Sequence, residues 1–143
     1  MDIRPAELTS PELLKLFSEH DAHMMDFLGE HRKYYTTYSE KEHLGRAWIV
    51  YLDGQPAGCA AYRERSEGVC EIKRVFIRPK YRGRGISREL LRTVEDYARE
   101  QGCTRIALDT NSALEPAVTL YRRSGYVVTH REGQYIQMEK CLS

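Results

Sequence analysis

The sequence predicts an α/β protein with a mixed, mostly antiparallel sheet flanked by helices on both faces. Two observations lead to this fold class. Runs of β-prone residues separated by turn signals come first, and a strand–helix–strand unit with helical apolar spacing follows them. The chain has 143 residues, 41% of them hydrophobic, which is enough for the core of a single domain spanning residues 1–143.

The N-terminal part predicts a strand and two helices. Residues 2–4 form the expected strand, and Ser10 caps a first helix that begins at Pro11. The apolar stripe of this helix is formed by Leu13, Leu14 and Phe17. A second helical stretch covers residues 21–31 and ends near Gly29. The polar, tyrosine-rich run HRKYYTTYSEKEHLG then predicts a loop or a broken helix.

Three strands are expected in the middle of the chain. Residues 47–64 hold two β-prone runs around Asp53 and Gly54, a dipeptide that favours a hairpin turn. The third strand covers residues 69–77 and ends before Pro79, because proline cannot donate a hydrogen bond to a sheet.

The C-terminal elements alternate between helix and strand. A helix extends from Gly85 to Gly102, a buried strand covers residues 104–110, and a second helix covers residues 114–125. Residues 126–130 and 135–140 form a closing hairpin.

The composition argues against several classes of protein. The chain has no run of about 18 apolar residues, so no membrane span is expected, and MDIRPAELTS lacks the apolar region of a signal peptide. The four cysteines include no CxxC pair, which argues against a zinc knuckle or a disulfide scaffold. Reduced thiols are typical of a cytoplasmic protein.

Positive charge is concentrated in residues 71–88, EIKRVFIRPKYRGRGISR. Within it, residues 73–88 hold seven basic residues and no acidic one, whereas the whole chain has a net charge of +1, so the rest of the chain carries −6. A nucleic-acid surface normally makes a whole domain basic. Charge focused in this way therefore favours a compact anionic group over a nucleic acid, and a plain solvated turn is the other alternative.

The same segment contains a glycine turn between a strand and a helix. Gly83 and Gly85 allow close approach to the backbone, the helix start offers free N–H groups, and Arg82 and Arg84 add charge. No Gly-Lys-Ser/Thr of a Walker A motif occurs, and Arg88 stands at the third glycine of a dinucleotide fingerprint. The turn therefore predicts an anion-binding site that is neither a Walker A loop nor a dinucleotide-binding loop.

Two motifs closely resemble those of the GNAT superfamily of acetyltransferases. The acetyl-CoA-binding motif, Arg/Gln-x-x-Gly-x-Gly/Ala, fits in two frames, and each departs at one position. The frames are Arg82, Gly85 and Ser87, which departs at Ser87, and Lys80, Gly83 and Gly85, which departs at Lys80. The LY-x-x-x-G-F/Y box is matched by Leu120, Tyr121, Gly125 and Tyr126. The resemblance covers residues 47–140.

The resemblance implies an N-acetyltransferase with acetyl-CoA as co-substrate. Such enzymes move the acetyl group to a primary amine by direct attack through a tetrahedral intermediate. A protein amine or an aminoacyl-tRNA is an alternative acceptor, and a non-catalytic acyl-CoA-binding regulatory module is an alternative function. No metal is expected, because the run HDAH at residues 20–23 does not complete a ligand set. A monomer and a homodimer both stay open.

The resemblance also implies which residues bind the cofactor. The pyrophosphate is expected on the backbone of Arg82, Gly83, Arg84, Gly85, Ile86, Ser87 and Arg88. The pantetheine arm is expected along the strand at Val75, Phe76 and Ile77. Asn111 is a further candidate for the cofactor arm, although Leu114 fills the position at which relatives carry asparagine.

Two residues are candidates for the chemistry. Tyr121 resembles the tyrosine that protonates the leaving thiolate, and packing on an apolar helix face is the alternative. Glu71 is a candidate general base acting through a water, with a salt-bridged glutamate as the alternative. Strand alternation places Glu71 on the face of Lys73, Val75 and Ile77. Whether Lys73 and Arg74 face the cofactor or the solvent stays open.

The acceptor is expected beside the tyrosine-rich run. One wall of the pocket is predicted from His31, Tyr34, Tyr35 and Tyr38, and amphipathic packing is the alternative for these rings.

Overall fold

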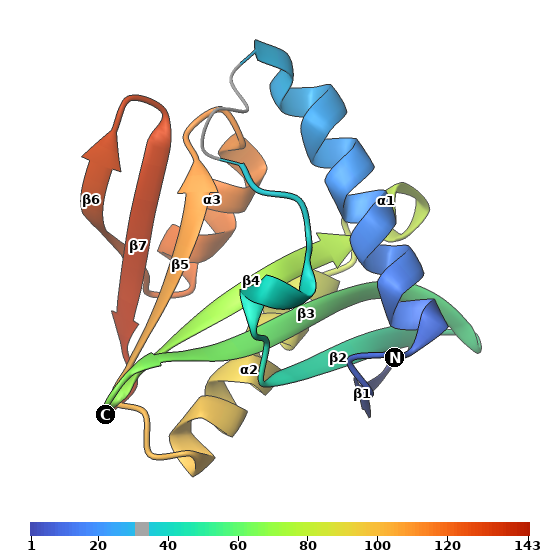
Figure 1. Ribbon diagram of the computed structural model, residues 1–143, viewed down its shortest axis with the longest axis horizontal. Helices are drawn as coiled ribbons and strands as arrows, with labels where there is room; N and C mark the ends of the chain where they lie inside the picture. Colours follow the sequence, from blue (N-terminus) through green and yellow to red (C-terminus); the bar gives the residue numbers. More distant parts are fainter. Residues whose placement is uncertain (31–34) are drawn as a thin grey trace.

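The computed structural model describes residues 1–30 and 35–143, and these form one seven-stranded sheet with three α-helices (Figure 1). The strands are β1 (Asp2–Ala6), β2 (Arg46–Leu52), β3 (Gln55–Ser66), β4 (Val69–Ile77), β5 (Arg105–Asn111), β6 (Val127–Glu132) and β7 (Tyr135–Cys141). The helices are α1 (Pro11–Leu28), α2 (Ile86–Glu100) and α3 (Glu115–Arg123), with 3-10 turns η2 (Glu40–Glu42) and η3 (Pro79–Tyr81).

The strand order is β1-β2-β3-β4-β5-β7-β6. All neighbouring pairs are antiparallel except β4 and β5, which run parallel with α2 as their crossover. The predicted mixed, mostly antiparallel sheet is therefore confirmed.

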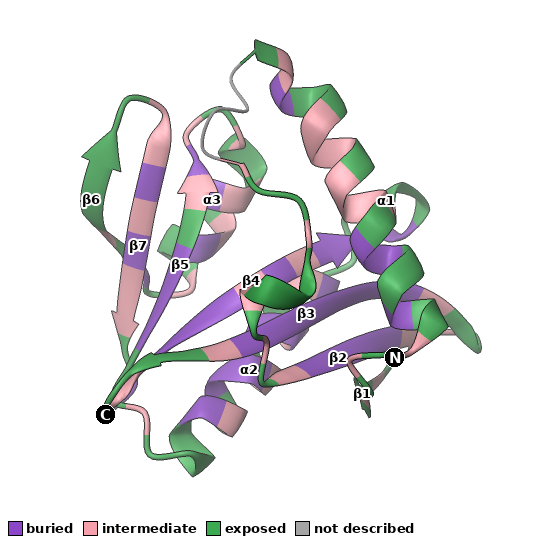
Figure 2. Cartoon of the chain, viewed as in Figure 1, coloured by how far each residue is buried: buried purple, intermediate pink, exposed green. Residues whose placement is uncertain are grey.

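Helices cover both faces of this sheet. On one face α1 inserts Leu13, Leu16 and Phe17 against β2, β3 and β4. On the other face α2 and α3 pack into a larger apolar cluster. Figure 2 shows the buried positions along β2–β4 and on the sheet-facing sides of the helices, while the edge strand β6 is mostly exposed. Within the described residues, no helix combines the length and apolar character needed to cross a bilayer.

The prediction of two N-terminal helices is wrong, because α1 is one continuous helix. Its start agrees with the sequence, since the Ser10 hydroxyl accepts a hydrogen bond from the Leu13 amide at 3.3 Å. Gly29 ends it with a φ of 53°. Asp21, in the middle of α1, pairs with Arg74 of β4.

Replacement of Gly58 with alanine is expected to lower the free energy of unfolding by about 1–3 kcal/mol. An added Cβ would overlap the carbonyl oxygen of Phe76 and lie 2.7 Å from Ile77 Cδ1, so β3 and β4 would have to move apart. Urea denaturation measures the change. Gly45→Ala is the control, because its Cβ would have its nearest neighbour at 3.6 Å, an ordinary contact. Equal stability of Gly58→Ala and the unsubstituted protein would contradict this packing.

Candidate active site

A gap between two parallel strands is the central feature of the candidate site. β4 and β5 pair only at Val69, Cys70 and Glu71 of β4. Beyond Glu71 the two strands diverge (Figure 1), and no strand among the described residues pairs with residues 72–77 on that side. The edge of β4 from residue 72 to residue 77 therefore keeps peptide groups that an extended ligand can pair with, as an added strand does.

A β-bulge lies in this diverging part of β4. Lys73 pairs with Ala61 of β3, and Phe76 pairs with Cys59. Between these two pairs β4 advances by three residues while β3 advances by two, so β4 contains one extra residue. Arg74 has a positive φ of 57° at this point. The extra residue shifts the alternation of side chains between the two faces.

This bulge corrects the predicted position of Glu71. Strand alternation predicted that Glu71 shares one face of the sheet with Lys73, Val75 and Ile77. The prediction is correct for Lys73 and wrong for Val75 and Ile77. Val75 and Ile77 pack in the cluster under α2. Glu71 lies on the opposite face, where its carboxylate pairs with Arg63 at 2.8 Å, and Lys73 lies 3.7 Å from Glu42 there.

The glycine turn leads directly into α2. Gly83 and Gly85 have φ values of 80° and 75°, a conformation that side chains disfavour. At either position, an added Cβ would lie more than 4 Å from every neighbouring atom of the residues that the structure describes. Gly85 is the N-cap of α2, and among the described residues no side chain forms a capping hydrogen bond with this helix. The first N–H groups of α2 thus face an open cradle that fits an anion.

Arginine side chains from this turn reach in different directions. The Arg82 guanidinium donates through Nε to the Ile77 carbonyl at 2.9 Å and lies 5.9 Å from the Phe76 ring centre. Arg84 lies 5.7 Å from the Tyr81 ring centre. In this arrangement, the two guanidinium groups lie against aromatic rings, and neither is placed over the start of α2.

Tyr121 is buried on the inner side of α3, in the same apolar cluster as Ile72 and Ile77 of β4. Burial raises the pKa of its hydroxyl to about 12. Its ring packs edge-on against Tyr126 at 5.9 Å. The Tyr126 hydroxyl donates to Glu95 at 2.8 Å, but no hydrogen bond of the Tyr121 hydroxyl occurs within the described part of the chain. That hydroxyl is free to donate to a ligand.

The other candidates have partners within the protein. Asn111 ends β5, and its Oδ1 accepts a hydrogen bond from the Ala113 amide at 2.8 Å, so it shapes the turn before α3. His31 and Tyr34 lie outside the described residues. The Tyr35 hydroxyl donates to Asp21 at 2.6 Å, and the Tyr38 amide donates to the same carboxylate at 3.0 Å. The roles of these residues toward ligands stay predictions.

The histidines of the HDAH run lie against Phe76. The His20 ring stacks on it at 5.3 Å, and His23 lies at 6.3 Å. Burial, together with the positive charge of Arg74, lowers the pKa of His20 to about 4, so this imidazole is neutral at pH 7. In residues 1–30 and 35–143, no three His, Cys, Asp or Glu side chains are grouped to hold a metal ion.

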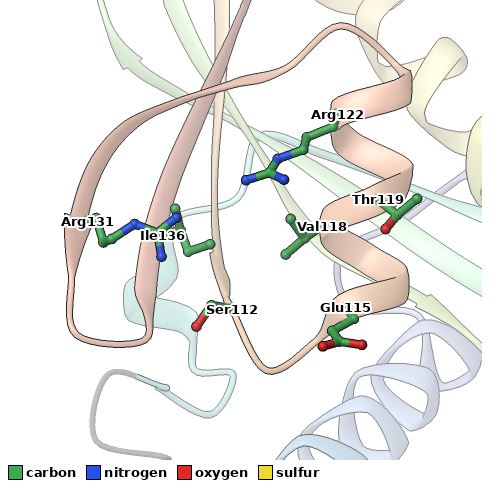
Figure 3. A pocket seen from close by; sticks show the side chains of 7 residues that line it. All are labelled: Ser112, Glu115, Val118, Thr119, Arg122, Arg131 and Ile136. Atoms are coloured by element: carbon green, nitrogen blue, oxygen red, sulfur yellow. The ribbon is translucent and has the colours of Figure 1, made fainter.

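A separate hollow of about 290 Å³ lies between α3 and the β6–β7 hairpin. Figure 3 shows the Arg122 and Arg131 side chains pointing into it from opposite sides. It is lined by Ser112, Glu115, Val118, Thr119, Arg122, Arg131 and Ile136. None of these residues belongs to β4 or to the glycine turn, so the hollow is not the gap between β4 and β5.

Comparison with known proteins gives consistent matches. The model of the acetyltransferase (GNAT) family matches residues 12–126. The IAA acetyltransferase of Azospirillum brasilense is 36% identical over 91 residues, which are 63% of this chain and 60% of that protein. The chain thus spans less than two thirds of the length of this curated relative.

Solved structures match over nearly the whole chain. A structure from Klebsiella pneumoniae, provisionally described as an acyl-CoA N-acyltransferase, has a TM-score of 0.80 at 26% identity and covers 99% of this chain and 97% of its own. The PaiA N-acetyltransferase of Thermoplasma acidophilum, solved in complex with coenzyme A, has a TM-score of 0.75 at 17% identity and covers 99% of both chains. The second likeness shows the fold alone.

Proposed function

The chain belongs to the GNAT acetyltransferase family, and from this premise we propose that it transfers the acetyl group of acetyl-CoA to a primary amine. The observation that carries the proposal is the divergence of β4 and β5 directly beside the open cradle at the start of α2. Coenzyme A has an extended pantetheine arm followed by a pyrophosphate, and the two features match these parts in that order.

The proposed cofactor contacts are mostly to the backbone. The pyrophosphate accepts hydrogen bonds from N–H groups in the stretch 82–88. The pantetheine arm pairs with β4 at residues 75–77, and an amide of this strand steadies the oxyanion of the tetrahedral intermediate. Asn111 donates a hydrogen bond to the cofactor arm from its amide nitrogen, because its Oδ1 already accepts one from the Ala113 amide.

The proposed reaction is a direct transfer. The amine nitrogen attacks the carbonyl carbon of the thioester, and the carbon–sulfur bond breaks as the tetrahedral intermediate collapses. Tyr121 gives its proton to the leaving thiolate. The attacking amine loses a proton through a water to Glu71, whose carboxylate also pairs with Arg63.

Replacement of Glu71 with glutamine is expected to lower kcat by about 10²-fold, because the amide cannot accept the proton of the amine. Release of the CoA thiol at saturating substrates measures this. Glu64→Gln, an exposed position on the neighbouring strand β3, is the control. If Glu71 serves only as the partner of Arg63, Glu71→Gln will change the unfolding midpoint and leave kcat unchanged.

The proposed function is tested with a panel of amines. Spermidine, L-lysine, kanamycin and a peptide with a free N-terminus represent polyamines, amino acids, aminoglycosides and protein amines. We expect CoA release above the rate of hydrolysis with at least one of them. Tight binding of acetyl-CoA without CoA release from any amine would instead support the alternative, a non-catalytic acyl-CoA-binding module.

A further inference from the structure

Arg74 connects the β4 bulge to the segment between α1 and β2. Its side chain is only 5% exposed, and the guanidinium is bound by groups from two other parts of the chain. From α1, the Asp21 carboxylate accepts a hydrogen bond from Nη1 at 2.6 Å. From the segment 35–42, which we call the acceptor-side segment, three residues accept hydrogen bonds from it.

These contacts use every nitrogen of the guanidinium. Nη1 also donates to the Tyr35 hydroxyl at 3.0 Å, and Nη2 donates to the Thr36 carbonyl at 3.1 Å. The Glu42 carboxylate accepts from Nη2 at 3.0 Å and from Nε at 3.3 Å. A planar guanidinium can bind several acceptors in fixed directions at once, which a lysine ammonium cannot.

The backbone conformation of Arg74 is unfavourable without these contacts. An arginine with a positive φ is uncommon, and a buried guanidinium loses its hydration. Such a conformation persists where surrounding contacts determine it. The segment in turn relies on Arg74, because residues 35–39 have no regular secondary structure and η2 is a single turn.

The position of this cluster links it to the gap. Arg74 follows Glu71, the last β4 residue that pairs with β5, by three residues, so it lies in the diverging part of β4. The Lys73 and Arg63 side chains add contacts to Glu42, at 3.7 Å to its carboxylate and 3.0 Å to its carbonyl respectively. The acceptor-side segment is thus fastened to the face of β4 that also carries Glu71.

We propose, on the basis of the proposed acetyltransferase function, that Arg74 is a positioning residue for the amine acceptor. It holds the acceptor-side segment against β4 beside the reacting thioester, and so forms the surface on which the amine is oriented. The acetyl-CoA contacts of the β4 edge and the glycine turn do not depend on the segment. Arg74 therefore affects the acceptor and leaves cofactor binding intact.

The variant Arg74→Gln tests this inference with the panel amine of highest rate. We expect the KM for that amine to rise at least about tenfold, because the acceptor-side segment is displaced and no longer forms the surface that orients the amine. The KM for acetyl-CoA should stay within about twofold. Hydrogen exchange of the amides in residues 35–42 should also become faster. Glu42→Gln, which weakens the cluster from the segment side, should raise the same KM if Arg74→Gln folds poorly.

Glu19→Gln is the matched control. Glu19 of α1 forms a two-point ion pair with Arg78, at 2.8 and 2.7 Å, and this pair does not involve the acceptor-side segment. We expect unchanged KM values for this variant. Normal CoA release with an unchanged acceptor KM in both Arg74→Gln and Glu42→Gln would overturn the inference about Arg74 and leave the proposed function standing. No CoA release from the unsubstituted protein with any amine would overturn the proposed function and the inference with it.

Discussion

Replacement of Tyr121 with phenylalanine is expected to lower kcat by about 10²- to 10⁴-fold, while the KM for acetyl-CoA changes little. The ring remains in the apolar cluster, and the lost hydroxyl makes no hydrogen bond within the described residues, so the fold should be retained. What is lost is the proton for the leaving thiolate. Thiol release at saturating substrates measures kcat, and thermal unfolding checks that the variant is folded.

The raised pKa of Tyr121 gives this prediction a pH dependence. A hydroxyl with a pKa of about 12 stays protonated at every lower pH. The unsubstituted enzyme should therefore lose no activity through this group between neutral pH and about pH 10. Tyr97→Phe is the control, because the Tyr97 ring packs against Trp48 and Tyr62 on the same side of the sheet. Equal kcat values for Tyr121→Phe and Tyr97→Phe would contradict the proposed acid.

Replacement of Gly85 with alanine is expected to raise the KM for acetyl-CoA by about 10- to 100-fold. This corresponds to the loss of about one hydrogen bond to a charged group. The methyl group would meet no atom of the described residues within 4 Å, but it would stand at the start of α2, where the proposed pyrophosphate site needs close approach to the backbone. Initial rates over a range of acetyl-CoA concentrations measure the KM.

Gly54→Ala separates strain from cofactor binding. Gly54 has a φ of 76°, nearly that of Gly85, and its Cβ would also meet nothing within 4 Å. It lies in the turn between β2 and β3, away from the cradle. The strain of alanine is therefore similar at both positions. A similar rise in KM in both variants, or in neither, would contradict a cofactor site at Gly85.

The sequence was sufficient to predict features that depend on local chemistry. The turn signal at Asp53 and Gly54 lies between β2 and β3, and Gly83 and Gly85 adopt the positive φ values that only glycine adopts easily. The alternation of strand and helix after residue 77 predicted a mixed sheet, and β4 and β5 are its parallel pair. Each of these features is determined by residues close together in the chain.

Features that depend on distant partners were not predictable. The bulge in β4 follows from its register with β3, and Arg74 is not a residue type that signals a positive φ. For this reason Val75 and Ile77 lie on the face opposite to Glu71, whereas strand alternation had placed all three on one face. Likewise, Glu95 interrupts the apolar stripe of α2 and is buried because Tyr126 and Lys140, far along the chain, bind its carboxylate.

The central claim is transfer of an acetyl group from acetyl-CoA to an amine. The most direct measurement follows isotope-labelled acetyl-CoA in the presence of the amine panel, with mass spectrometry of the products. We expect the label in an amide of at least one amine, formed in equal amount to free CoA. Label that appears only as acetate, or stays in acetyl-CoA with every amine, would contradict the account.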